Sequence, residues 1–178
     1  QRIDERRLAG IGRADQGDEA AFRVLRLRHV RFALVALVVL VVLVIVLVLL
    51  TALLAWVVLP DHLVTGALLL TAGTLHAVRL ARWAGDRTLA EPLVAVLHLG
   101  YAFLPLGALA LGAEILAPGL IGMAAAQHLW MGGAAGLMTL AVMTRATLGH
   151  TGQTLTAGPG TVLVYAALVV AVLARFAA

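Results

Sequence analysis

The chain has 178 residues, of which 62% are hydrophobic and only 12% are charged, and its net charge of +4 comes from arginine alone. Soluble domains are about 25% charged, so this composition excludes an ordinary soluble domain and indicates a membrane protein. The sequence contains no cysteine and no serine, which excludes disulfides, thiolate metal sites and serine or cysteine nucleophiles. Histidine, methionine and tyrosine remain as metal or haem ligands, and the arginine surplus indicates membrane topology rather than nucleic-acid binding.

The N-terminal segment is polar and basic. Residues 1–31 hold eight of the thirteen arginines, together with five acidic residues. We predict that this segment is cytoplasmic and forms a short amphipathic helix over about 19–29, lying on the membrane surface. Residues 32–178 form the second predicted part of the chain, a membrane-embedded bundle.

Apolar runs after residue 31 are long enough to cross a bilayer. A spanning helix needs about 20 apolar residues, and the run from 32 to 59 exceeds this with Thr51 as its one polar residue. Its Val/Leu monotony favours a lipid-facing span. The fold class predicted from these runs is all-α, a polytopic transmembrane bundle of about five spans, namely 32–59, 63–80, 93–116, 120–143 and 161–176.

Arginine is distributed unevenly among the loops. The N-terminal segment and the loops after the second and fourth spans carry arginine, whereas the loops after the first and third spans carry none. By the positive-inside rule this alternation predicts a cytoplasmic N-terminus. Arg175 near the C-terminus is the exception, and a side chain at that position can reach the interface.

Two histidines fall inside predicted neighbouring spans. His76 lies about one turn before the end of the second span, and His98 lies one to two turns into the third. A short loop makes these spans antiparallel neighbours, so both imidazoles are expected at a similar depth. They are candidate axial haem ligands or copper ligands. The alternative is that each imidazole bonds a carbonyl or lines a helix contact. Tyr101 shares the face of His98, as does Pro105, which predicts a kink.

Further candidates surround the fourth span. His128 lies among small residues that let another helix or a flat macrocycle approach closely, and Gly132 and Gly136 form a Gly-x-x-x-Gly step, which is more typical of plain helix packing. Arg145 is a candidate partner for an anionic group, or a topology anchor. His150 lies on the following loop, as a candidate ligand or as a solvated residue.

The fourth span and its loop resemble the NnrS family. The resemblance rests on HLWMG at 128–132 and GLMTLAVMTRATLGHTG at 136–152, with LH at 75–76, RTLAEPL at 87–93, HLGY at 98–101 and LPLG at 104–107 upstream. It covers about residues 63–155 and matches the C-terminal half of a family whose members are about twice as long. Residues 1–59 show no resemblance, so we expect the chain to be a fragment, a short member or part of a larger assembly. The expected protein partners are partner helices or the missing N-terminal half of the family.

The resemblance implies a bacterial inner-membrane protein that contains haem and copper and acts in denitrification or the nitric oxide response, protecting against nitrosative stress. The motif residues implied for cofactor binding are His76, His98, His128, His150, Arg145 and Tyr101, with the four histidines as metal ligands. Nitric oxide or its metal adducts are the implied partners besides the bilayer. The competing hypothesis is a non-catalytic membrane subunit that packs against a partner or handles a metal or haem in transit.

Overall fold

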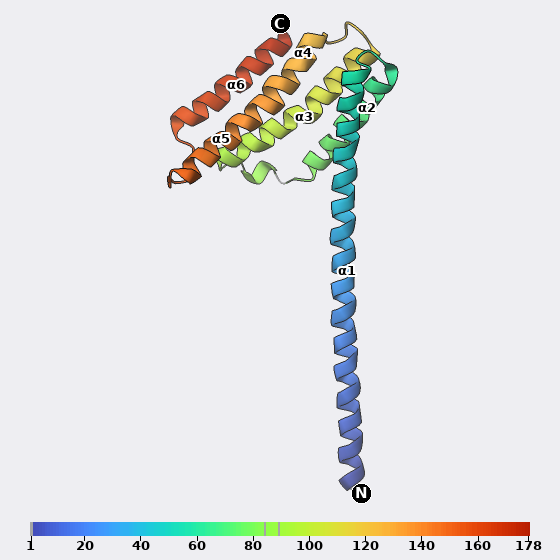
Figure 1. Ribbon diagram of the computed structural model, residues 1–178. Helices are drawn as coiled ribbons and strands as arrows, with labels where there is room; N and C mark the ends of the chain where they lie inside the picture. The colour runs from blue at the N-terminus through green and yellow to red at the C-terminus, as the bar shows by residue number, and fades with distance from the viewer. Residues whose placement is uncertain (1, 84, 89) are drawn as a thin grey trace. The chain divides into compact units, whose positions relative to one another are not determined.

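The computed structural model describes residues 2–83, 85–88 and 90–178, with side chains from residue 25 onward apart from residue 86. This part of the chain is helical and contains no strand (Figure 1). The elements in order are α1 (Arg2–Val58), α2 (Leu63–Ala81), the short 3₁₀ helix η1 (Gly85–Thr88), α3 (Pro92–Leu116), α4 (Met123–His128), the π-helical segment η2 (Leu129–Gly136), α5 (Leu137–His150) and α6 (Pro159–Ala177). The predicted all-α class is confirmed.

Four helices are long and apolar enough to cross a membrane. They are residues Leu25–Val58 of α1, together with α2, α3 and α6. Their bounds lie within a few residues of the predicted spans, except that α1 begins much earlier than residue 32. The fourth predicted span is helical from Met123 onward, but it consists of α4, η2 and α5 following one another without a break.

The chain divides into two units, Gln1–Val44 and Ile45–Ala178. In the first unit α1 runs unbroken through the predicted boundary at residue 31. Between residues 25 and 44 all but one of its apolar side chains are exposed, among them Leu37 and Val39. An exposed helix that is apolar on all sides is typical of a membrane span in contact with lipid.

The second unit is a bundle with one continuous apolar core. Figure 1 shows α3, the α4–η2–α5 segment and α6 lying side by side, and α2 packs along α3. Small residues bring the backbones together: a Cβ atom on Gly112 would lie 2.9 Å from the carbonyl oxygen of Gly66. Such close packing replaces the hydrophobic effect as the force that joins helices in lipid.

The π-helical segment is also packed through glycine and aromatic residues. A Cβ on Gly107 of α3 would lie 3.0 Å from the backbone nitrogen of Trp130, and one on Gly133 would overlap the ring of Phe103. The indole of Trp130 stacks on Trp56 of α1, with ring centroids 6.1 Å apart. The π-helical turn is wider than an α-helical one. Together with these close contacts it fixes η2 against α3 and the end of α1.

Glu114 organises the loop between α3 and α4. Its carboxylate is buried near the end of α3 and accepts three backbone N–H bonds at 2.8–2.9 Å, from Gly119, Ile121 and Gly122. Both glycines have positive φ, which lets the chain turn tightly there. The carboxylate therefore accepts the N–H groups of three loop residues and holds the turn between α3 and α4 in one conformation.

We expect Glu114→Gln to loosen this loop, because a glutamine side chain keeps only one acceptor oxygen. The amides of residues 119, 121 and 122 should exchange hydrogen about tenfold faster or more, as expected when a charge-assisted bond is lost. Hydrogen exchange measured on the full chain in detergent checks this. Asp61→Asn, an exposed change in the neighbouring α1–α2 turn, is the control, and equal exchange in both variants would contradict the role of Glu114.

Candidate functional site

An aromatic cluster joins the ends of α2 and α3 that meet η1. Nδ1 of His76 and the hydroxyl of Tyr101 are 2.6 Å apart and share a hydrogen bond. The Tyr101 ring lies 4.7 Å from Trp83, and Trp83 meets His98 edge-on at 5.5 Å. The predicted neighbours His76 and His98 therefore belong to one cluster, connected through Tyr101 and Trp83.

His76 is the buried end of this cluster. It is only 3% exposed, and its Nε2 has no hydrogen-bond partner among the described residues. On the other side of the cluster, the Arg79 guanidinium lies 5.4 Å from the Trp83 ring centroid and 5.7 Å from that of Tyr101. These cation–π contacts hold both rings at the helix end.

The His76–Tyr101 bond is expected to matter for stability. Tyr101→Phe keeps the ring contacts but leaves both ring nitrogens of a buried imidazole without a partner, at a cost of about 1–3 kcal/mol. The measurement is thermal unfolding of the detergent-solubilised chain. The double variant Tyr101→Phe/His76→Leu should recover much of the loss because no polar atom is then stranded, and additive losses would contradict the pairing.

His98 stands at the wall of a cleft. Its Nδ1 lies 3.2 Å from the carbonyl oxygen of Val94, which can only accept, so Nδ1 carries the proton and Nε2 keeps a free lone pair. The cleft has a volume of about 830 Å³ and runs between α3 and α6, with Trp83 at one end. Among the lining side chains that the structure describes, none is charged and most are apolar.

Tyr165 of α6 lines the opposite wall of this cleft, and sequence reasoning missed it. The residue is 6% exposed and its hydroxyl has no hydrogen-bond partner among the described residues. In the sequence it is one tyrosine in a short apolar span without a motif around it. The one signal in the sequence is its depth. Tyr165 lies about six residues from the start of α6, just as His98 lies about six residues from the start of α3.

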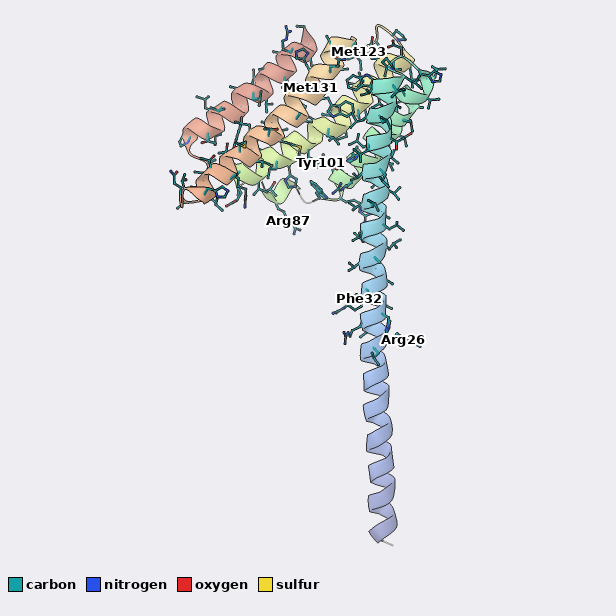
Figure 2. All side chains as sticks on the ribbon, in the orientation of Figure 1. Arg26, Phe32, Arg87, Tyr101, Met123 and Met131 are labelled. Atoms are coloured by element: carbon teal, nitrogen blue, oxygen red, sulfur yellow. The ribbon has the colours of Figure 1, made fainter. Side chains whose placement is uncertain are left out.

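The other predicted residues lie outside the cluster. His128 bonds the carbonyl of Ala124 through Nδ1 at 2.7 Å, and Arg145 is exposed on α5. His150 is also exposed, but it is the last residue of α5 and not a loop residue as the sequence predicted. Met131, marked on η2 in Figure 2, is 67% exposed, whereas Tyr101 is half-buried in the cluster. No group of three or more histidine, aspartate or glutamate side chains gathers as a metal site within residues whose side chains are described.

The fold and the site define a helical membrane protein with a hydrogen-bonded histidine–tyrosine pair and a largely apolar cleft. The chain belongs to the NnrS family, whose model, described as NnrS protein, matches residues 19–178. The match is wider than the 63–155 region in which the motifs lie, and it corrects the expectation that the first span is foreign to the family. Comparisons with curated proteins and with solved structures gave no significant match.

Proposed function

We propose that this protein binds haem in the cleft between α3 and α6 and acts in the nitric oxide response of a bacterial inner membrane. Family membership supports a haem- and copper-containing membrane protein of that response in general terms. The observation that carries the proposal for this chain is the combination of His98 Nε2, which has a free lone pair, with a cleft of about 830 Å³ at its side.

The residues of the cleft fit a haem. A histidine that holds iron commonly donates its other ring N–H to a backbone carbonyl, and His98 makes this bond to Val94. The apolar walls suit a macrocycle, and Trp83 fixes the imidazole by its edge-on contact. When bound, haem supplies an iron centre that takes up nitric oxide and exchanges electrons. His98 would hold it, and the walls would keep water away.

The described residues do not fit a complete copper site. Copper in proteins is held by several nitrogen or sulfur donors. His76 offers one nitrogen without a hydrogen-bond partner, and no group of three potential metal ligands forms around it among the described residues. We therefore assign no role to copper in this part of the chain. His76, His128 and His150 would bind a metal, as the sequence predicts, only together with ligands that the described side chains do not supply.

The topology we propose places the N-terminus in the cytoplasm, as the arginine distribution indicates. The cluster and the mouth of the cleft then lie near the cytoplasmic face, where α2 ends and α3 and α6 begin. Nitric oxide is small, apolar and soluble in lipid, so it reaches the cleft without a water-filled path. A largely apolar cleft between membrane helices suits a protein that intercepts nitric oxide inside the bilayer.

The test is the visible spectrum of the purified full chain, with iron and copper analysis, before and after addition of nitric oxide. We expect one haem per chain and a spectral shift with nitric oxide. A chain that is folded but free of haem after supplementation during expression would overturn the proposal. That outcome would favour the alternative of a non-catalytic membrane subunit.

A further inference from the structure

Three arginines surround α1 just before its long apolar run begins. They are Arg26, Arg28 and Arg31, all of them exposed, and together they form what we call the arginine collar. Figure 2 marks Arg26 and Phe32, the first residue of the apolar run, on α1. With about 3.6 residues per turn, Arg28 and Arg31 lie on one side of the helix and Arg26 on the other. The collar therefore presents positive charge in more than one direction around the helix.

No acidic side chain neutralises the collar from its own part of the helix. Residues that pair along a helix lie three or four positions apart, and the sequence contains no aspartate or glutamate between Glu19 and Asp61. His29, the other ionisable residue of this stretch, directs Nδ1 to the carbonyl oxygen of Leu25 at 2.8 Å. The collar thus holds three positive charges that have no acidic neighbour within reach along α1.

The length and composition of the collar match the headgroup layer of a bilayer. Its three positions span about 8 Å along the helix axis, and the polar layer adds about 5–8 Å on each side of the hydrocarbon core. Leu27 and Val30, which alternate with the arginines, are 60% and 59% exposed. Such a mixture suits a zone in which apolar side chains contact acyl chains and guanidinium groups contact phosphates.

We infer that the arginine collar binds the phosphate groups of anionic phospholipids, so that α1 gathers lipids with a net negative headgroup around the protein. Arginine forms paired hydrogen bonds to phosphate oxygens. A cluster of positive charges next to a membrane span favours anionic lipids over zwitterionic ones. The inference concerns α1 alone and does not depend on the proposed haem site.

The experiment measures the preference of the purified full chain for phosphatidylglycerol over phosphatidylcholine. Native mass spectrometry counts the lipids bound to the detergent-solubilised chain after incubation with equal amounts of both. Each arginine near an anionic membrane surface strengthens binding about fivefold. We expect Arg26→Gln/Arg28→Gln/Arg31→Gln to lower the preference about tenfold or more, because glutamine keeps the helix and removes the charge. An unchanged preference in this variant would overturn the inference.

Arg82→Gln/Arg87→Gln/Arg175→Gln is the matched control. It removes three exposed arginines from the second unit and changes the net charge by the same amount. This variant should keep the preference. An equal loss in both variants would overturn the inference, because net charge alone would then set the preference. Displacement of phosphatidylglycerol by a short DNA duplex at equal phosphate concentration would also overturn it, in favour of nucleic-acid binding.

Salt gives a second test that needs no variant. Raising the ammonium acetate concentration from about 0.1 M to about 1 M shortens the Debye length from about 10 Å to about 3 Å. Because the collar is exposed, we expect the preference of the wild-type chain to fall toward equal binding of the two lipids. A preference that is the same at both concentrations would overturn the inference.

Discussion

Replacing His98 with glycine is expected to remove haem from the purified chain, and imidazole added to the buffer is expected to restore it. The substitution deletes the one imidazole that lines the cleft and leaves a gap that a free imidazole fills. Mutation of a residue that hydrogen-bonds a metal ligand typically lowers metal affinity about 10- to 100-fold. Haem affinity should fall by more than this in the His98 variant, because the bond to iron itself is lost. Haem bound per chain and the absorption spectrum are the measurements.

His128→Gly is the matched control for this variant. His128 also bonds the carbonyl four residues before it through Nδ1, but it lies on α4 and does not line the cleft. It should retain haem. Loss of haem in His128→Gly with retention in His98→Gly would move the ligand to α4, where the sequence also predicts one. Loss without imidazole rescue in His98→Gly would indicate a structural role for His98.

Gly112→Ala is expected to give the largest loss of stability from a single methyl group in the α2–α3 contact. The added Cβ would lie 2.9 Å from the carbonyl oxygen of Gly66 and 3.0 Å from the backbone nitrogen of Leu70. Both atoms belong to the backbone, so the helices must separate. Overpacking of this kind costs about 2 kcal/mol, which lowers the melting temperature of a chain this size by about 4–8 °C.

Gly160→Ala tests whether the effect comes from the contact. No atom lies within 4 Å of the Cβ that alanine would add there, and Gly160 belongs to the first turn of α6. Alanine is the better helix former by up to about 1 kcal/mol, so this variant should be unchanged or slightly more stable. Equal melting temperatures for Gly112→Ala and Gly160→Ala would contradict the packing argument.

The sequence predicts the spanning helices well because their signal is length and apolarity. α2, α3 and α6 begin and end within about two residues of the predicted spans. Two features escape such reasoning. The unbroken α1 joins a charged segment to an apolar one, and helix propensity continues across that change of composition. The π-helical turn of η2 depends on how Trp130 and Gly133 meet Trp56 and Phe103, which no local pattern encodes.

For the site, spacing predicts His76 and His98 at similar depth, and the structure joins them through Tyr101 and Trp83. What spacing cannot give is the direction in which each imidazole points: His98 stands at the open cleft, whereas His76 is enclosed. The place of Tyr165 on the cleft wall could not be predicted from its depth alone, because it arises only when α6 lies across the cleft from α3.

A crystal structure of the haem-loaded chain, with anomalous diffraction measured at the iron absorption edge, tests the central claim most directly. We predict an iron peak in the cleft between α3 and α6, about 2 Å from Nε2 of His98, the usual length of an imidazole–metal bond. An iron peak beside His76, His128 or His150 instead, with the cleft empty of haem, would contradict the account.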